Sequence, residues 1–274
     1  MTNDVSNSAF YCCGVRMEDA RQPFPICNDR FAQRFMDEHA VTVFEPFRTE
    51  TLPNISNATR CRIIDDILRS ELKPDSTIIS IGAGFDTRPY RLKGGTWIEL
   101  DEAPLLAYKN EKLPAAECGN PLRRIAIDFS RESLGDKLAG VGANQPVIIV
   151  IEGVFMYLEP AAILANLREL RRLFPHHILL CDLMNRRFFE KFSGSVHAKL
   201  VAMGGTFTAR PEHPEEIFLH NGYLEADRIP MVRRALELGV YRRRLGIPDF
   251  LAKLMLNFFL KDLSGYAIFQ FRSA

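Results

Sequence analysis

The sequence has little of several features that mark common classes of protein. Its formal net charge is only +1 over 274 residues, so no field of one sign attracts nucleic acid or an anionic membrane. Its apolar runs are too short to cross a bilayer, and one of the longest, Ile247–Leu260, carries a polar stripe of Asp249, Lys253 and Asn257 typical of an amphipathic helix. We therefore expect a protein that binds neither nucleic acid nor membrane.

The six cysteines also lack a pattern. None forms a C-x-x-C pair and Cys12 and Cys13 are adjacent, which suits neither a zinc site nor a disulfide framework. The first residues, Met-Thr-Asn-Asp, lack the charged and apolar regions of a signal peptide. We expect reduced thiols, no metal and a cytoplasmic location.

Two familiar phosphate-binding motifs are missing where a glycine turn is present. The β-branched run Thr77–Ile81 predicts a buried parallel strand, and Gly82 and Gly84 follow it directly. The third glycine of G-x-G-x-x-G would fall at Thr87, and no Gly-Lys-Ser/Thr follows, so an NAD-dependent dehydrogenase and a P-loop are disfavoured. A strand, a glycine turn and a helix still form the first unit of a nucleotide-binding sheet.

Strands and helices alternate from this turn onward. Helices are expected at Pro104–Leu113 and Pro160–Phe174. The expected strands are Thr77–Ile81, Thr96–Leu100, Arg124–Ile127, Pro146–Ile151, Ile178–Cys181, Tyr223–Ile229 and Gly265–Arg272. This order predicts an α/β fold with a doubly wound sheet and right-handed crossovers.

The chain is interpreted as one domain over residues 1–274, with a helical cap. The expected parts are an N-terminal helical cap segment (1–56), a cofactor-binding core (57–185), a cap insertion with the C-terminal helices (186–262) and a last strand (263–274).

Three finer predictions concern the N-terminal part. Asn28 or Asp29 is expected to start a helix that runs through Asp37, and residues 41–48 are expected to be an extended connection. Ser56 or Asn57 is the expected N-cap of a helix over 58–72.

Acidic residues occur near the ends of four successive strands. They are Glu99 and Asp101 on strand two, Asp128 after strand three, Glu152 after strand four and Asp182 after strand five. Ligands of open α/β sheets lie beyond the carboxyl ends of the strands, so these carboxylates are expected to face one ligand.

The chemistry of these positions indicates what the ligand contains. Asp101 lies near the ~20 residues after the glycine turn that suit a ribose-binding acid. Asp128 could accept from an adenine amine, and Glu152 could face a positive group. Ribose, adenine and an ammonium together describe S-adenosylmethionine, whose carboxylate needs a cation such as Arg60 or Arg62.

Five runs in this order resemble a known family. They are Thr59–Asp66, the Ile-Gly-Ala-Gly-Phe-Asp-Thr-Arg run Ile81–Leu92, Glu99–Asp101, Asp128–Phe129 and the Glu-Gly-Val-Phe-Met-Tyr-Leu run Glu152–Leu158. The chain resembles the leucine carboxyl methyltransferase family, particularly the bacterial branch similar to polyketide carboxyl O-methyltransferases. The resemblance covers about residues 55–185 and extends loosely through 28–32, where Arg30 departs from the family's Asp-Pro-x-Ala.

The resemblance implies a class I methyltransferase fold, an α/β fold with a doubly wound, mostly parallel seven-stranded sheet and a helical cap. It also implies S-adenosylmethionine as the cofactor. By position, the resemblance implies that Arg60 holds the methionine carboxylate, Gly82 approaches the cofactor's amino-acid part and Asp101 binds the ribose. It also implies that Asp128 and Phe129 frame the adenine and that Glu152 lies near the methionine ammonium. Gly84 and Asp86 share the glycine turn, and Tyr157 is expected to position the acceptor.

Each role has an alternative. Arg60 could pair with Asp65 or Asp66, and Glu99 could meet the ribose in place of Asp101 because the two share a strand face. Asp128 could only cap a helix, and Tyr157 could belong to the core.

The acceptor is expected to be a carboxylate of a small molecule such as a polyketide-type metabolite. A carboxylate needs no general base, and the six histidines form no tight ligand pair, although His197, His213 and His220 keep a hydroxyl acceptor open. Aromatic surface for the acceptor, or packing for the cap, is expected from Phe188, Phe189, Phe192, Phe207 and Phe218. A protein C-terminal carboxylate as acceptor and a non-catalytic cofactor-binding role remain alternatives, and the oligomeric state is open.

Overall fold

A mixed sheet of seven strands forms the centre of the molecule. The computed structural model describes residues 4–143, 145–208 and 211–273, except the side chains of 4–6 and 255–260. The strands lie in the order β3-β2-β1-β4-β5-β7-β6. Their bounds are β1 (Thr77–Ile81), β2 (Thr96–Asp101), β3 (Leu122–Ala126), β4 (Val147–Ile151), β5 (His177–Met184), β6 (Tyr223–Pro230) and β7 (Tyr266–Ser273).

The direction of the strands confirms the predicted fold class. Strands β1 to β5 pair in parallel, whereas β7 runs antiparallel to both β5 and β6. The strand order reverses between β1 and β4, so the crevice for a ligand is expected beside the ends of these two strands.

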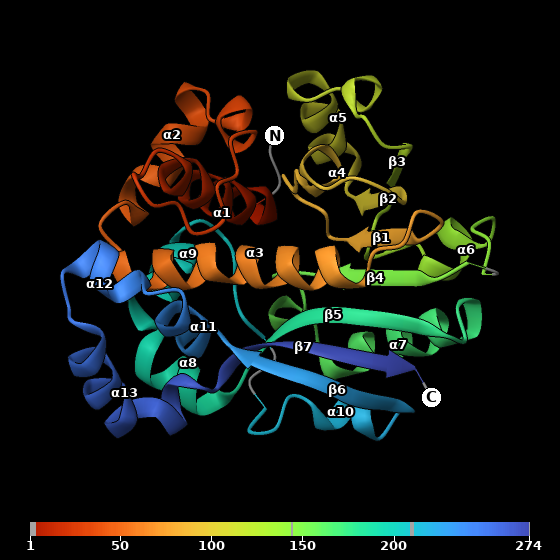
Figure 1. Cartoon of the computed structure of the whole chain (residues 1–274). Helices are drawn as coiled ribbons and strands as arrows, with labels where there is room; N and C mark the ends of the chain where they lie inside the picture. The colour runs from red at the N-terminus through yellow and green to blue at the C-terminus, as the bar shows by residue number, and fades with distance from the viewer. Residues whose placement is uncertain (1–3, 144, 209–210, 274) are drawn as a thin grey trace.

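Helices cover both faces of the sheet, which explains the continuous apolar runs of β1 and β4. Helix α3 (Thr51–Glu71) crosses one face (Figure 1) and packs Ile64 and Leu68 against Ile78. Side chains alternate along a strand, so Ile79 points to the opposite face, where α7 (Pro160–Leu173) packs. Burial of both faces suits strands made of isoleucine and valine.

The remaining helices lie around this core. On the chain between β1 and β5 these are α4 (Arg88–Arg91), α5 (Ala103–Lys112), η3 (Ala115–Glu117), α6 (Leu134–Leu138) and η4 (Phe155–Tyr157). After β5 come α8 (Arg186–Phe192), α9 (Gly194–Ala202), α10 (Glu216–Leu219), α11 (Met231–Glu237), α12 (Val240–Leu245) and α13 (Asp249–Leu263). Figure 1 shows α1 (Asp4–Ala20), α2 (Glu38–Phe44), α8, α9, α11, α12 and α13 at the left, beyond the carboxyl ends of the parallel strands.

The N-terminal segment differs from the sequence prediction. The expected helix through Asp37 is only a single turn, η1 (Ala32–Phe35), and Asp37 instead caps α2 (Glu38–Phe44) by accepting from the backbone N–H of Ala40. Residues 41–48, expected to be extended, belong largely to α2 and η2 (Glu45–Phe47). The helix signal of this stretch was hidden by its mixed polarity.

Two further boundaries were wrong. Helix α1 (Asp4–Ala20) was not predicted, and α3 begins at Thr51, seven residues before the expected start. Pro53 lies in the first turn of α3, where proline is tolerated. Asn57 is therefore a buried helical residue and not an N-cap.

Strand β5 is longer than expected and ends at Met184, so Asp182 lies within it. At the other end of the chain, the predicted amphipathic segment is helical as α13, although the side chain of Asn257 lies outside the described residues. None of the described helices has the length and apolarity needed to span a membrane.

Candidate functional site

A cavity of about 1100 Å³ lies beyond the carboxyl ends of β1, β2 and β4. Its walls come from the turn at residues 80–86, the loops after β3 and β4, and helices α1, α3, α8, α9 and α11. This is the switch point of the strand order, where an open α/β sheet binds its ligand.

The glycine turn after β1 brings bare backbone to the cavity. Gly82 and Gly84 have φ angles of +66° and +46°, which a residue with a side chain rarely adopts. A Cβ on Gly82 would lie 2.4 Å from Cγ2 of Val154, in the loop after β4. The turn therefore requires glycine at 82 both for its conformation and for its contact with that loop.

Asp101 is the carboxylate that reaches this turn. Its Oδ2 accepts from the N–H of Gly84 at 2.6 Å, and its Oδ1 accepts from the N–H of Glu102 at 2.8 Å. Burial raises the pKa of Asp101, and these two N–H groups act in the opposite direction. The side chain lines the cavity.

Glu99 was the alternative to Asp101, and the structure places it elsewhere. Its carboxylate is fully buried and ion-paired with Lys109 at 2.8 Å and with Arg124 at 2.9 Å. Arg124 is its direct neighbour on β3. Glu99 shares a strand face with Asp101 but lies two residues farther from the strand end, outside the cavity lining, so its assignment to the cofactor is corrected.

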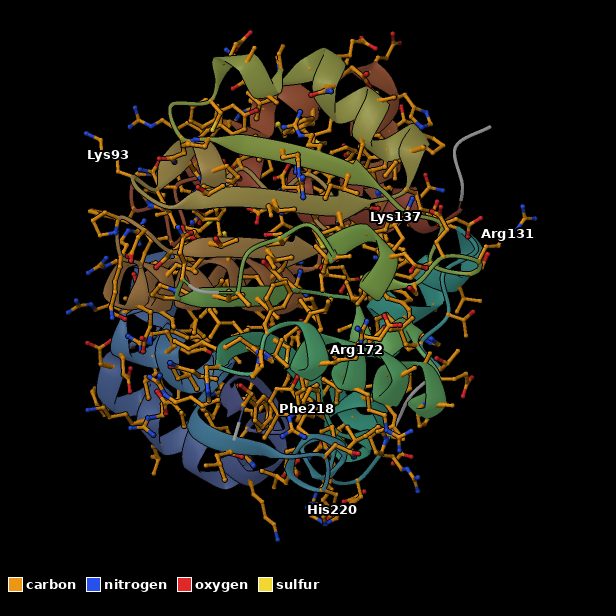
Figure 2. The ribbon with its side chains drawn as sticks, turned by 90° about the vertical axis from the view of Figure 1, so that its right-hand side faces the viewer. Lys93, Arg131, Lys137, Arg172, Phe218 and His220 are labelled. Carbon is orange, nitrogen blue, oxygen red and sulfur yellow. The ribbon has the colours of Figure 1, made fainter. Side chains whose placement is uncertain are left out.

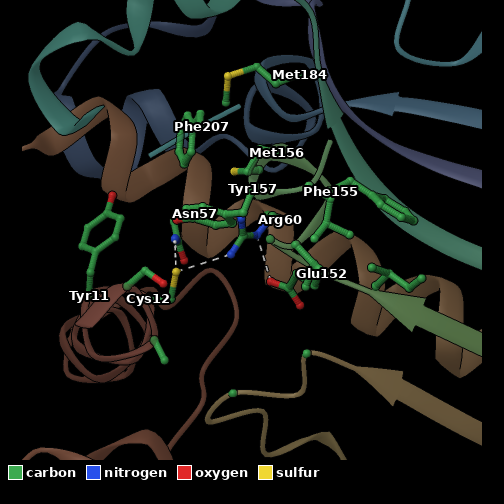
Figure 3. Close-up of a pocket in the computed structure, with 18 of the residues that line it drawn as sticks. Tyr11, Cys12, Asn57, Arg60, Glu152, Phe155, Met156, Tyr157, Met184 and Phe207 are labelled. Carbon is green, nitrogen blue, oxygen red and sulfur yellow. Dashed lines mark hydrogen bonds and ion pairs between the residues drawn. The ribbon is translucent and has the colours of Figure 1, made fainter. Parts of the chain in front are cut away.

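Arg60 and Glu152 form an ion pair at the floor of the cavity (Figure 3). Nε of Arg60 donates to Oε1 of Glu152 at 2.9 Å, and Nη1 donates to Oδ2 of Asp182 at 3.1 Å. Burial alone lowers the pKa of Arg60, but Tyr266, Asp182 and Glu152 together raise it well above its usual value. The alternative pairing with Asp65 or Asp66 is wrong, because Asp65 pairs with Arg88 and Arg91, and Asp66 with Arg62 and Arg69.

A second arginine completes this charged floor. Nη1 of Arg88 contacts Oε2 of Glu152 at 2.7 Å and Oδ2 of Asp86 at 3.0 Å. Burial raises the pKa of both carboxyls, but Arg88, aided by Arg60 at Glu152 and by Lys109 at Asp86, lowers each pKa to about 2. Both side chains are therefore ionised at neutral pH, and both line the cavity.

Of the two residues expected at the adenine, only one lies in the cavity. Phe129 lines the cavity, together with Ile127. Asp128 does not, because its exposed carboxylate turns back to accept from the backbone N–H and hydroxyl of Ser130. Asp128 is thus corrected to a turn residue, and the following helix α6 is capped by Ser133.

The other end of the cavity is apolar and belongs to the cap. Tyr157 lies there in edge contact with Phe207, with ring centroids 5.1 Å apart. Of the five expected phenylalanines, Phe188, Phe192 and Phe207 line the cavity. Phe189 packs beside Phe207 within the cap. Phe218, labelled in Figure 2, stacks on Phe271 on the face of the sheet that α7 covers.

Three residues of the cavity were not predicted as site residues: Asn57, Cys12 and Tyr266. Asn57 donates to Sγ of Cys12 at 3.1 Å, so α1 and α3 meet at the cavity (Figure 3). Tyr266, the first residue of β7, reaches the same floor and donates to Asp182. The position of Asn57 one turn before Arg60 could have indicated it, whereas Cys12 and Tyr266 lie outside every motif.

The three histidines that kept a hydroxyl acceptor open do not line the cavity. His197 contacts the ring of Phe207 but does not line the cavity, and His213 and His220 are exposed. Among the residues that the structure describes, no three His, Cys, Asp or Glu side chains are grouped to hold a metal.

Comparison with known sequences supports a single family. The model of the leucine carboxyl methyltransferase family matches residues 11–171. An S-adenosyl-L-methionine-dependent methyltransferase of Gibberella zeae, dpfgK, is 25% identical over 247 residues, which cover 83% of this chain and 82% of that protein. The tetracenomycin polyketide synthesis O-methyltransferase TcmP of Streptomyces glaucescens is 26% identical over 173 residues, 61% of this chain and 62% of that protein.

Solved structures show the same fold. A DUF574 family protein of Streptomyces avermitilis matches with a TM-score of 0.60 and 12% identity over 97% of both chains. The geranyl diphosphate C-methyltransferase of Streptomyces coelicolor matches with a TM-score of 0.50 and 11% identity, over 96% of this chain and 98% of that one. The predicted class I fold and the cofactor S-adenosylmethionine are confirmed. The chain is a methyltransferase that uses S-adenosylmethionine and belongs to the leucine carboxyl methyltransferase family.

Proposed function

We propose that this protein transfers the methyl group of S-adenosylmethionine to a carboxylate of a small, largely apolar molecule. The observation that supports this most strongly is that one cavity joins two unlike ends. Asp101 and the Arg60–Glu152 pair lie at one end, and aromatic side chains of the cap lie at the other.

At the charged end, each side chain suits one part of the cofactor. Asp101 is proposed for the ribose, because each of its oxygens accepts one backbone N–H and keeps a second acceptor position. Arg60 is proposed for the methionine carboxylate and Glu152 for the ammonium. Gly82 and Gly84 let the backbone approach the ligand, Asp86 stays paired with Arg88, and Phe129 is proposed for the adenine.

At the apolar end, Tyr157 and Phe207 are proposed to hold the acceptor beside the methyl group. Burial raises the pKa of Tyr157, so its hydroxyl stays protonated and acts as a wall and hydrogen-bond donor. Glu50 also reaches this end, but its carboxylate is ion-paired with Lys199 and hydrogen-bonded by Ser195. These side chains suit positioning better than proton removal.

The proposed reaction needs no general acid or base from the protein. S-adenosylmethionine supplies a sulfonium-bound methyl group with a neutral thioether as leaving group. A carboxylate oxygen attacks the methyl carbon, the carbon–sulfur bond breaks with its electrons on sulfur, and a neutral methyl ester forms. A carboxylate is ionised at neutral pH, so holding the two reactants in line is the main contribution of the cavity.

The names of the relatives agree with this choice. The family is described by carboxyl methylation, and TcmP by O-methylation in polyketide synthesis. A large apolar wall suits an aromatic or polycyclic acid, so the partner is proposed to be a small molecule.

The test is transfer of labelled methyl from S-adenosylmethionine to matched acceptors: aromatic carboxylic acids, the corresponding phenols, and peptides with a free C-terminal carboxylate. The expected product is a methyl ester of an acid, which releases labelled methanol in mild alkali. An alkali-stable ether would replace the proposal with hydroxyl methylation, and turnover of peptides alone would replace it with protein methylation. Cofactor binding without transfer to any acceptor would indicate a non-catalytic role.

A further inference from the structure

We infer that Tyr266 on the last strand is a positioning residue of the cofactor site: together with Asp182 it orients the Arg60 guanidinium toward the carboxylate of S-adenosylmethionine. The inference rests on the proposed function, because it takes Arg60 as the cation for that carboxylate. Tyr266 lies outside residues 11–171, the part that the family model matches.

Three polar groups meet in a closed triangle. The Tyr266 hydroxyl donates to Oδ2 of Asp182 at 2.7 Å and accepts from Nη1 of Arg60 at 2.9 Å. Nη1 of Arg60 also donates to Oδ2 of Asp182 at 3.1 Å. The tyrosine hydroxyl thus fixes both the carboxylate and the guanidinium that depend on it.

The sheet explains why these residues meet although they are distant in sequence. Asp182 on β5 is paired with Ile268 on β7, and Tyr266 lies two residues from Ile268 on the same face. Such diagonal neighbours are within reach of an aromatic side chain. Oδ1 of Asp182 accepts from the N–H of Gly153 at 2.6 Å, which ties the triangle to the loop that carries Glu152.

The pairing leaves one edge of Arg60 for a ligand. Nε is used by Glu152, and Nη1 by Asp182 and Tyr266. Nη2 faces the partly exposed thiol of Cys12, at 3.5 Å from Sγ. Thiols are weak acceptors, so a ligand carboxylate can take this donor in place of the sulfur. Rotation of the guanidinium would remove Nη2 from that position, and the Tyr266–Asp182 contact opposes the rotation.

The chemistry of Tyr266 suits this task. Its side chain is buried, lines the cavity and packs on Phe188 with ring centroids 5.5 Å apart. Burial raises the pKa of its hydroxyl well above the usual value, so the group keeps its proton and donates to Asp182 throughout the neutral range.

The test compares two thioether ligands that differ in the group Arg60 is proposed to hold. S-adenosylhomocysteine carries the amino-acid part, and 5′-methylthioadenosine lacks it but keeps the adenosine. Both are titrated calorimetrically into wild type and Tyr266→Phe, which removes only the hydroxyl. The expected result is about a tenfold loss of affinity for S-adenosylhomocysteine, with methylthioadenosine affinity unchanged within a factor of about two.

Tyr223→Phe is the matched control. Tyr223 is also a buried tyrosine, but its hydroxyl contacts His177 and Leu167 and it does not line the cavity. Both ligands should bind this variant as they bind wild type. In an Arg60→Gln background, Tyr266→Phe should cause no further selective loss, since it acts through Arg60.

The possible failures are distinguishable. An equal loss for both ligands in Tyr266→Phe, or no loss for either, would overturn the positioning role while leaving an Arg60→Gln effect in place. Unchanged selectivity in Arg60→Gln would overturn the proposed role of Arg60 and the inference with it. If Tyr266→Phe does not fold, Asp182→Asn must show the same selective loss, and an unselective loss there would overturn the inference.

Discussion

Asp101 at the end of β2 accepts a hydrogen bond of 2.6 Å from the backbone N–H of Gly84, in the turn after β1. This bond fixes the carboxylate where the two neighbouring strands open onto the cavity. The glycine turn and the acid are therefore one unit, although 17 residues separate them in the chain.

Asp101→Asn is expected to weaken binding of S-adenosylhomocysteine and of 5′-methylthioadenosine equally, because both keep the ribose. Hydrogen bonds to a charged group contribute roughly 1.5–3 kcal/mol, which corresponds to about 10- to 150-fold in affinity. Calorimetric titration measures the change. Asp128→Asn, an exposed position outside the cavity lining, is the control and should bind both ligands normally. Normal binding by Asp101→Asn would rule out the ribose assignment.

Gly82→Ala is expected to destabilise the fold as well as the site. A non-glycine residue at φ +66° costs about 1–3 kcal/mol, and the new Cβ would also press on Val154 at 2.4 Å. Denaturant unfolding checks the loss. Gly140→Ala, where a Cβ meets nothing within 4 Å, should leave the free energy of unfolding nearly unchanged. A Gly82→Ala protein as stable as wild type would contradict the conformation of the turn.

The charge network at the floor predicts a pH dependence of stability. Arg88 and Arg60 outweigh the effect of burial and lower the pKa of Glu152 from 4.5 to about 2. A lowered carboxyl pKa stabilises the folded state above pH 4.5, and this stabilisation disappears as the pH falls toward 2. At about 1.4 kcal/mol per pKa unit, Glu152 contributes at most ~3 kcal/mol to the free energy of unfolding.

Urea unfolding of wild type and Glu152→Gln between pH 6 and pH 2 measures this contribution. The difference in the free energy of unfolding between the two proteins should be largest at pH 6 and shrink on acidification. A difference that stays constant down to pH 2 would mean that Glu152 does not titrate with a lowered pKa.

Substitution of two phenylalanines distinguishes a role in acceptor binding from a role in core packing. Phe207→Ala removes a ring from the cavity and should raise the KM for the acceptor with a small effect on cofactor affinity. Phe218→Ala leaves a cavity at a fully buried position on the face of the sheet that α7 covers. It should cost ~3–5 kcal/mol of stability without a selective change in the KM for the acceptor. Steady-state kinetics and thermal unfolding of both variants give the comparison. An acceptor KM that is normal in Phe207→Ala would place the acceptor elsewhere.

The central strands of the sheet could be predicted because both of their faces are buried. The apolar runs of β1 and β4 have no polar alternation, and they are separated by turns and amphipathic helices that local patterns indicate well. The acids at the strand ends follow from the same reasoning. The ion-pair partners of these acids could not be predicted. Glu99 and Asp101 look equivalent along the strand, and only the ion pairs of Glu99 with Lys109 and Arg124 distinguish them.

The cap could not be predicted to the same degree. Helix α1 and the start of α3 have mixed polarity because they pack partly on the cavity and partly on each other, so the simple amphipathic period is lost. Tyr266 reaches the site through antiparallel pairing of β7 with β5, and such long-range register leaves no trace in a local motif. Asp128 follows a strand as a ligand-binding acid would, but the turn that it forms with Ser130 directs its carboxylate away from the cavity.

The measurement that tests the proposed site most directly is a crystal structure of the complex with S-adenosylhomocysteine. The expected result places the ligand in the cavity beyond β1, β2 and β4, with its ribose hydroxyls on Asp101, its carboxylate on Nη2 of Arg60 and its adenine beside Phe129. A ligand bound in the cavity with its amino-acid part away from Arg60 and Glu152, or bound outside the cavity, would contradict the assignment of the charged floor to the cofactor.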